Sequence, residues 1–215
     1  MTCVKRATRV IVIRHGETVW NVAARIQGHG DSPLTAVGVE QAEALARRLA
    51  LEKFDVLISS DLGRAMQTAR RIAELSPHDV IPDPRFRERS FGAGEGLGYE
   101  EIDLRYPAAF SRVGEVDPDY AIPGGESRRQ FHERIAAAFE SVVREHAGKT
   151  VVVVAHGGVL ATFYRHVHDI GLASPHRIPI ANASYNALRH DDGVFAVEAW
   201  ADTDHLPGAV PFEEN

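Results

Sequence analysis

The hydrophobic and polar positions of the chain alternate between short apolar runs and longer amphipathic stretches. Three runs rich in Val, Ile and Leu occupy residues 9–13, 55–59 and 150–154, and continuous apolar character is typical of strands covered on both faces in a parallel sheet. Apolar positions recur at helical spacing in residues 35–51, 61–75, 126–146 and 157–170. This alternation predicts an α/β fold, a three-layer α/β/α sandwich with a mostly parallel central sheet.

The periodicity weakens in the middle and at the end of the chain. Residues 90–125 carry several glycines and a Pro-Gly-Gly turn, which predicts an insertion in a single domain spanning residues 1–215. We expect this insertion to cover the edge of the sheet, where ligands of such folds bind. Residues 184–188 and 194–200 flank an Asp-Asp-Gly turn and are interpreted as a hairpin. The residues from 207 onward are interpreted as a tail.

Composition narrows the classes of partner. The 215 residues are 44% hydrophobic and 25% charged, as in ordinary globular domains, and the net charge of -6 gives no general attraction to nucleic acid or to a membrane surface. The single cysteine, Cys3, cannot form an internal disulfide, and no apolar run has the length of a signal sequence or a membrane span. We therefore expect a cytoplasmic protein that binds neither nucleic acid nor membranes.

The tripeptide Arg14-His15-Gly16 directly follows the first apolar run. In open α/β sheets, ligands bind outside the carboxyl ends of the strands. A guanidinium can bind phosphate oxygens bidentately, a glycine lets the backbone approach them, and a neutral imidazole can attack phosphorus without a metal. The alternative is a structural histidine that closes a strand, which would be favoured for an isolated His-Gly pair.

A second His-Gly pair, His156-Gly157, follows the third apolar run. If the two runs are neighbouring parallel strands, both imidazoles lie within a few ångströms of each other. His156 would then support the charge of phosphoryl oxygens while His15 stays neutral to attack. The matched contexts favour this hypothesis over two unrelated core histidines.

Two further residues are candidates on weaker grounds. Arg64 opens the helix after the second run and would point to the same edge of the sheet, although an arginine there is usually a solvated charge. Glu88 lies among three arginines and would protonate a departing alkoxide, although spacing alone favours a surface network. His166 and His168 occupy alternate helical positions that face apart, and no zinc protease signature occurs, so no metal site is expected. No cofactor is expected either.

The chain resembles the histidine phosphatase superfamily, which includes the cofactor-dependent phosphoglycerate mutases. The resemblance extends along nearly the whole chain and is carried by several ordered blocks. These are residues 14–21, Gln27-Gly28, residues 34–42, Ser59-Ser60, residues 64–69, Glu88 before Phe91-Gly92, residues 124–127 and His156-Gly157-Gly158.

The resemblance implies a role for each matched residue. His15 would be the nucleophile that becomes phosphorylated, and Glu88 would be the proton donor that later activates water. The resemblance also implies a phosphate pocket and a substrate-binding pair. The phosphate pocket would comprise Arg14, Asn21, Arg64, His156 and Gly157, and the substrate contacts would be Gln27 and Gly28.

The blocks do not by themselves separate hydrolysis from phosphoryl transfer to another alcohol. In the mutase branch the second histidine block usually reads His-Gly-Asn, whereas this chain has Gly158 at the third position. The mutases also have a longer insertion that supplies an arginine pair. The insertion of this chain is modest, and Arg128-Arg129 do not match that pair. A metal-independent phosphatase acting on a small phosphorylated metabolite is favoured, with phosphoglycerate mutase as the alternative. A noncatalytic protein that binds phosphorylated ligands is a third hypothesis, against which Glu88 argues, because a binder needs no proton donor.

The alcohol part of the substrate and the oligomeric state stay open, with a homodimer as one possible assembly. Four aromatic residues of the insertion either line an apolar pocket or simply pack in a core. They are Phe91, Tyr99, Tyr106 and Phe110.

Overall fold

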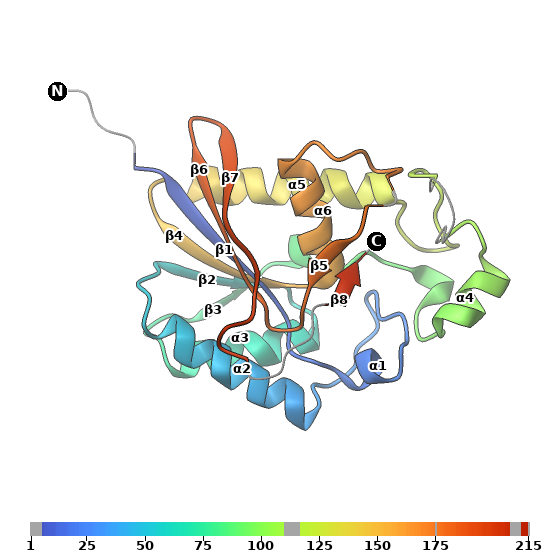
Figure 1. Cartoon of the computed structure of the whole chain (residues 1–215), viewed down its shortest axis with the longest axis horizontal. Helices are drawn as coiled ribbons and strands as arrows, with labels where there is room; N and C mark the ends of the chain where they lie inside the picture. Colours follow the sequence, from blue (N-terminus) through green and yellow to red (C-terminus); the bar gives the residue numbers. More distant parts are fainter. Residues whose placement is uncertain (1–5, 110–116, 175, 207–211, 215) are drawn as a thin grey trace.

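A six-stranded sheet with helices on both faces forms the centre of the protein (Figure 1). The computed structural model describes residues 6–109, 117–174, 176–206 and 212–214. The strand order is β3-β2-β4-β1-β6-β7, in which the first four strands are parallel and the last two are antiparallel. The strands are β1 (Thr8–Arg14), β2 (Val56–Ser59), β3 (Val80–Pro82), β4 (Thr150–Ala155), β6 (Tyr185–Asp191) and β7 (Val194–Asp202).

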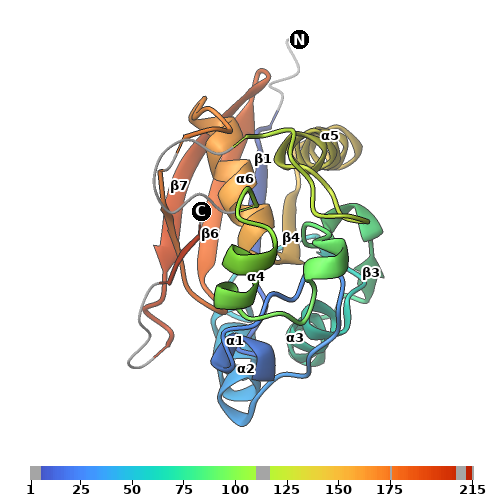
Figure 2. The same ribbon diagram turned by 90° about the vertical axis from the view of Figure 1, so that its right-hand side faces the viewer.

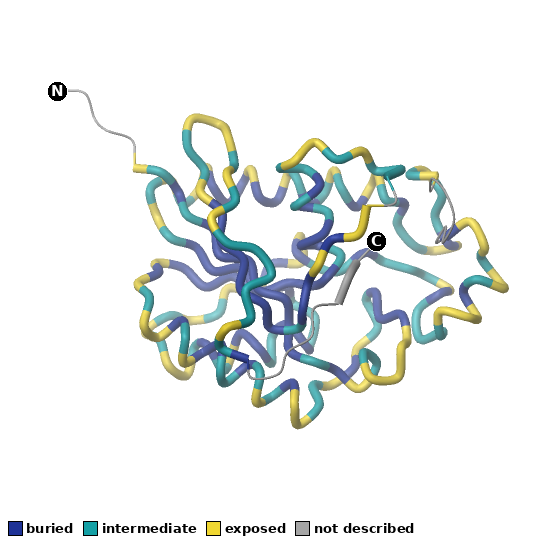
Figure 3. Tube along the Cα trace, in the orientation of Figure 1, coloured by how far each residue is buried: buried dark blue, intermediate teal, exposed yellow. Residues whose placement is uncertain are grey.

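The middle of each central strand is a continuous apolar run because both faces of the sheet are covered. In β1, Val10 and Val12 pack into one core cluster, whereas Ile11 and Ile13 pack into the cluster on the opposite face. All four side chains are fully buried. The buried strands appear as the dark blue centre of Figure 3, and the continuous apolar runs that predicted them reflect burial on two sides.

Four long helices cover the two faces of the sheet. Helices α2 and α3 contribute to one core cluster, and helices α5 and α6 contribute to the other. Thr35 caps α2 at its N-terminus, because its hydroxyl accepts a hydrogen bond from the Gly38 amide at 3.0 Å. These helices are α2 (Ala36–Leu49), α3 (Gly63–Glu74), α5 (Arg128–Glu145) and α6 (Gly157–Val167). The predicted three-layer α/β architecture is confirmed.

Shorter elements lie beyond the carboxyl ends of the parallel strands. Figure 2 shows α4 in front of the sheet and α1 below it. The insertion contains α4 (Tyr99–Arg105) and the 3-10 helix η2 (Gly92–Gly94), and a second 3-10 helix, η1 (Pro84–Phe86), precedes it. The small helix α1 (Val19–Val22) follows β1 and begins at Thr18, whose hydroxyl accepts a hydrogen bond from the Asn21 amide.

The end of the chain differs in part from the sequence prediction. The hairpin is confirmed as β6 and β7. The interpretation of the residues from 207 onward as a tail is wrong for residues 212–214, because β8 (Phe212–Glu214) pairs with β5 (Ile178–Ile180) in a separate two-stranded sheet. Strands of three residues are too short to produce a hydrophobic period. Cys3 and Phe110 lie outside the described residues. No helix among the described residues is long and apolar enough to cross a membrane.

Candidate active site

The two predicted histidines end neighbouring strands of the sheet. The β1 and β4 strands pair in parallel with Arg14 opposite Ala155, and the His15 amide extends this ladder by donating to the Ala155 carbonyl at 3.0 Å. His156 directly follows Ala155, the last residue of β4. The two imidazole centroids are 5.2 Å apart in an edge-to-face arrangement, so the structure places the rings together as the sequence predicts.

The hydrogen bonding of His15 fixes which ring nitrogen carries the proton. Its Nδ1 lies 2.8 Å from the carbonyl oxygen of Gly16, and because a carbonyl only accepts, Nδ1 carries the hydrogen and Nε2 keeps its lone pair. Burial, followed by the nearby Arg64 and Arg14 guanidinium groups, holds the pKa of His15 well below its usual value. His15 is therefore a neutral imidazole with an unprotonated Nε2 at neutral pH.

His156 is a neutral imidazole whose two nitrogens are both occupied. Arg64 donates from Nε to Nδ1 at 3.2 Å, so the proton of His156 resides on Nε2 and is donated to the Ser60 hydroxyl at 2.8 Å. Burial, Arg64 and the neighbouring His15 hold the pKa of His156 well below its usual value. His156 is 0% exposed and lies behind the cavity wall rather than in it.

Two arginines are buried beside the histidines. Arg14, the last residue of β1, donates to the Ile180 carbonyl at 3.0 Å. Arg64 is 1% exposed, and besides its bond to His156 it donates to the carbonyls of Gly28 at 2.7 Å and Gly30 at 2.8 Å. Burial lowers the pKa of Arg64 to about 10, which leaves it charged at neutral pH. The alternative of a solvated surface charge is wrong for Arg64.

The backbone around His15 is tightly packed. A Cβ at Gly16 would lie 2.4 Å from the Gly38 carbonyl oxygen in the first turn of α2, which explains why glycine follows the histidine. Glu17, for which the sequence offers no catalytic role, accepts a hydrogen bond from the Thr35 hydroxyl at 2.7 Å. The start of α2 therefore fixes the loop that carries His15.

Three predicted contacts come from the loop after β1. The Asn21 side-chain oxygen accepts from the amide of Thr18 at 3.0 Å, and the Gln27 side-chain oxygen is buried without a hydrogen-bond partner among the described residues. Gly28 adopts φ +53°, where a Cβ would lie 2.3 Å from a carboxylate oxygen of Glu95. All three residues line the cavity described below.

The Glu88 side chain contacts the first turn of α6 and does not belong to a surface network. Its carboxylate accepts from the Gly158 amide at 2.9 Å and from the Arg89 amide at 2.8 Å. A Cβ at residue 158 would lie only 2.2 Å from this carboxylate. The neighbouring Arg85 and Arg87 pair instead with aspartates, Asp83 and Asp61, so the alternative of a surface cluster around Glu88 is wrong.

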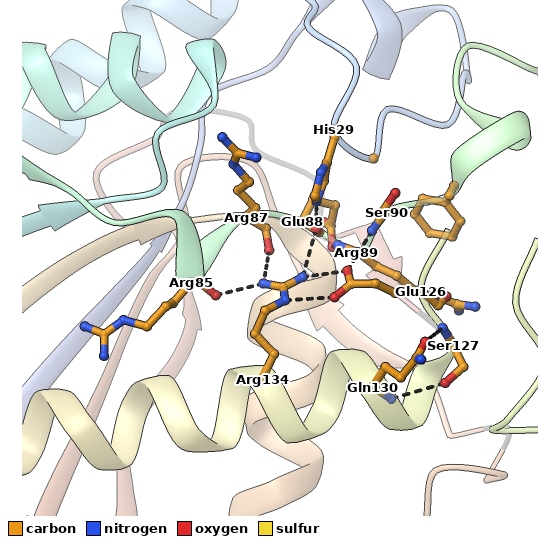
Figure 4. A network of polar contacts seen from close by, with 12 residues as sticks. His29, Arg85, Arg87, Glu88, Arg89, Ser90, Glu126, Ser127, Gln130 and Arg134 are labelled. Atoms are coloured by element: carbon orange, nitrogen blue, oxygen red, sulfur yellow. Dashed lines mark hydrogen bonds and ion pairs between the residues drawn. The ribbon is translucent and has the colours of Figure 1, made fainter. Parts of the chain in front are cut away.

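A polar network that the sequence did not reveal holds the Glu88 loop in place (Figure 4). From α5, Arg134 donates to the carbonyls of Arg85 at 2.8 Å, Arg87 at 3.0 Å and Glu88 at 3.2 Å. The same guanidinium forms an ion pair with Glu126 at 2.7 Å. Because one rigid planar group binds three carbonyls of the loop, Arg134 positions the backbone that carries Glu88.

A cavity of about 340 Å³ opens onto these residues. Every predicted site residue except His156 contributes to its wall. These are Arg14, His15, Asn21, Gln27, Gly28, Arg64, Glu88 and Gly157. Phe91 and Tyr99 of the insertion also line it, whereas Tyr106 packs against the small core cluster around Ile102.

Sequence reasoning missed several other residues of this wall. Asn182 donates to the His15 carbonyl at 3.0 Å, and Arg89, Arg128 and Arg165 also line the cavity. Asn182 follows the short β5 strand, which has no detectable period. Among the described residues, no group of three histidine, cysteine or acidic side chains is placed to hold a metal ion.

Paired histidines and buried arginines meet at the carboxyl ends of the parallel strands of this α/β protein. This arrangement is typical of an enzyme that acts on phosphate groups. The chain belongs to the histidine phosphatase superfamily, branch 1, which matches residues 10–203. It is therefore a phosphohydrolase or mutase of that superfamily, with a phosphoglycerate mutase-like fold.

Individual relatives of this chain include both kinds of enzyme. It is 39% identical to a metal-independent phosphoserine phosphatase of Arabidopsis thaliana, over 93% of this chain and 83% of the relative. It is 36% identical to a probable phosphoglycerate mutase GpmB of Proteus mirabilis (strain HI4320), over 92% and 94%. The solved structure of a phosphoserine phosphatase mutant from Entamoeba histolytica in complex with phosphoserine superposes with a TM-score of 0.82, at 29% identity, covering 93% of this chain and 99% of that one.

Proposed function

We propose that this protein is a metal-independent phosphatase that hydrolyses small phosphomonoesters through a phosphohistidine on His15. The observation that carries the proposal is the state of His15, a neutral imidazole with an unprotonated Nε2 that lines the same cavity as Glu88. Such a nitrogen is a competent nucleophile without a metal.

In the first half of the proposed reaction, His15 Nε2 attacks phosphorus and the bond from phosphorus to the ester oxygen breaks. The departing alkoxide takes a proton from the Glu88 carboxyl group, and the neutral alcohol leaves. Arg14 and Arg64 bind the phosphoryl oxygens, where their charge stabilises the transition state. His15 Nδ1 keeps its proton and its hydrogen bond to Gly16, which stabilises the positive ring of the phosphohistidine.

In the second half, the Glu88 carboxylate takes a proton from water as the water oxygen attacks phosphorus. The N–P bond breaks, its electron pair returns to Nε2, and inorganic phosphate leaves. His156 assists if its imidazole ring moves so that Nε2–H donates to a phosphoryl oxygen instead of to the Ser60 hydroxyl. This exchange of acceptor requires no change of tautomer.

The relatives support this proposal. The Arabidopsis relative is named a metal-independent phosphatase, and the Entamoeba structure holds a phosphorylated amino acid. A small phosphorylated metabolite would fit a cavity of this size.

The proposal is tested by hydrolysis of p-nitrophenyl phosphate in the presence of a chelator, together with acid-labile, alkali-stable phosphorylation in a rapid quench. We expect metal-independent turnover and a phosphoryl group on His15 by mass spectrometry. His15→Ala should lose both signals while keeping the same folded circular dichroism spectrum. Turnover that persists in His15→Ala would contradict the phosphohistidine pathway.

Phosphoglycerate mutase is the second candidate, favoured by the similarity to the probable mutase of Proteus mirabilis. Both reactions share the first half and differ in whether water or a second alcohol accepts the phosphoryl group. Isomerisation of 3-phosphoglycerate faster than hydrolysis of any ester would favour the mutase.

A further inference from the structure

Residues 27–30 form a tight turn beside the proposed phosphate pocket. The Gly30 amide donates to the Gln27 carbonyl at 2.8 Å and closes the turn. Gly28 adopts φ +53°, a backbone conformation that favours glycine. A closed turn of this kind has little conformational freedom, so the carbonyls and the side chain that it presents keep fixed directions.

Two carbonyls of this turn fix the plane of the Arg64 guanidinium. Arg64 Nη2 donates to the Gly28 carbonyl at 2.7 Å, and Nη1 donates to the Gly30 carbonyl at 2.8 Å. The third hydrogen bond runs from Nε to His156 Nδ1 at 3.2 Å. A guanidinium has five N–H groups, so in the described part of the chain one hydrogen on each Nη stays available. These two hydrogens are the ones with which Arg64 would bind phosphoryl oxygens.

His29 lies between those two glycines and binds the loop of the proposed proton donor. Its Nε2 is 2.9 Å from the Glu88 carbonyl oxygen, and because a carbonyl only accepts, Nε2 carries the hydrogen and donates it. The same carbonyl accepts from Arg134 at 3.2 Å. Figure 4 shows the His29 and Arg134 side chains approaching this loop from opposite sides. Together they satisfy both lone pairs of the carbonyl and hold the backbone from which the Glu88 side chain extends.

The Glu95 carboxylate makes a second link between the same two segments. Its Oε1 accepts from the His29 amide at 2.9 Å and from the Phe91 amide at 3.0 Å. His29 itself is half-buried and does not line the cavity. A substrate in the cavity would therefore not contact His29, and an effect of His29 on the reaction has to act through Glu88.

We propose that His29 is a positioning residue that couples the phosphate pocket to the proton donor, because one rigid turn aligns Arg64 and holds the Glu88 loop. This inference rests on the proposed function, which assigns Arg64 to the phosphoryl oxygens and Glu88 to the departing oxygen. The bond that breaks has phosphorus at one end and that oxygen at the other. A carboxyl group that is displaced from the oxygen therefore costs rate even when the phosphate is bound correctly.

The kinetic test compares two aromatic esters on the full chain in the presence of a chelator. Benzyl phosphate releases an alkoxide that needs a proton, whereas p-nitrophenyl phosphate releases a stabilised phenolate. In His29→Ala we expect kcat for benzyl phosphate to fall about tenfold, the upper range for one net hydrogen bond. We expect kcat for p-nitrophenyl phosphate to fall less than about threefold. KM should stay within about twofold for both esters, because His29 does not contact the substrate.

Two conservative variants separate positioning from a merely structural role. A glutamine amide reaches about as far as Nε2 of histidine, so His29→Gln should restore kcat for benzyl phosphate to within about threefold of the unmodified enzyme. An asparagine amide reaches only as far as Nδ1, so His29→Asn should behave like His29→Ala. The matched control is His176→Ala, which removes an exposed imidazole whose residue forms its hydrogen bonds through the backbone. This control should leave both kcat values unchanged.

An equal fall in kcat for both esters in His29→Ala would overturn the proposal, because a structural role weakens both reactions alike. Equal kcat values for benzyl phosphate in His29→Gln and His29→Asn would also overturn it. This comparison of the two amides does not depend on whether the alanine variant folds.

Glu88→Gln separates this inference from the proposed function. It should increase the ratio of kcat for p-nitrophenyl phosphate to kcat for benzyl phosphate. If this ratio increases in Glu88→Gln but not in His29→Ala, the phosphatase mechanism is retained and the role of His29 is refuted. If the ratio increases in neither variant, Glu88 is not the proton donor, and the inference about His29 is refuted with it.

Discussion

Gly158→Ala tests whether the position of Glu88 controls the departure of the alcohol. The added Cβ would lie 2.2 Å from one carboxylate oxygen of Glu88, whereas ordinary contact begins at 3.4 Å. The carboxylate must therefore retreat by about 1.2 Å, the difference between these two distances. The carboxylate is the end of a flexible side chain and can move, but the move weakens its hydrogen bonds from the amides of Gly158 and Arg89.

A displacement of about 1 Å from reactive geometry costs on the order of 100-fold in rate. The loss should depend on the leaving group, because an alkoxide needs a proton far more than p-nitrophenolate does. We expect kcat/KM for O-phosphoserine to fall about 100-fold in Gly158→Ala and kcat/KM for p-nitrophenyl phosphate to fall less than about tenfold. Glu88→Gln should show the same leaving-group dependence.

The control is Gly98→Ala, in which the added Cβ meets only a carboxylate oxygen at 3.9 Å, an ordinary contact. Thermal unfolding should change little in Gly158→Ala, since alanine suits the first turn of a helix. An unchanged ratio of the two kcat/KM values in Gly158→Ala would refute the assignment of Glu88 as the acid. A large loss of thermal stability would instead show that the first turn of α6 moves to relieve the clash, and not the carboxylate of Glu88.

Three further predictions concern charge and positioning. Arg64→Lys should lower kcat/KM at least about 100-fold and the free energy of unfolding by about 2–4 kcal/mol in urea titrations, because an ammonium cannot reproduce three buried hydrogen bonds. Because the pKa values of His15 and His156 are held low, kcat/KM should persist below about pH 6.5. The free energy of unfolding should decrease as the pH falls below about 6.5, since only the unfolded state then gains protons on these histidines. A stability maximum near about pH 5 would contradict this prediction. Arg134→Met should lower kcat more than it raises KM in steady-state assays, and an effect confined to KM would assign Arg134 to substrate binding.

The parts of the site that the sequence predicted depend on strongly buried strands. The β-branched runs identify β1 and β4, and parallel pairing then brings His15 and His156 together without further information. The order of the chain also places Arg64 at the start of α3. The spacing of Glu88 alone favoured a surface network. Nothing in the neighbouring sequence shows that its carboxylate accepts a hydrogen bond from the amide of Gly158, which lies in a helix 70 residues later.

Other parts of the site depend on contacts that no local pattern encodes. Arg165 lies inside α6 and Arg128 in the first turn of α5, and in sequence both look like charges on amphipathic helices. Their shared wall exists because the 171–172 turn returns to bind both guanidinium groups. The tautomer of His15 likewise depends on one carbonyl orientation, which follows from the packing of the neighbouring glycine against α2.

The charges of the proposed site are arranged so that the substrate completes it. Without a ligand, burial together with the charges of Arg64 and Arg14 lowers the pKa of both histidines, which keeps Nε2 of His15 available for attack. A bound phosphate dianion would offset these two cations and raise the pKa of both imidazoles, which favours His156 as a donor to phosphoryl oxygens. His15 would be protected from protonation at that moment because its Nε2 faces phosphorus, an electrophile, in the reactive complex. A dianionic ester would thus be required both for binding and for tuning its own catalytic groups.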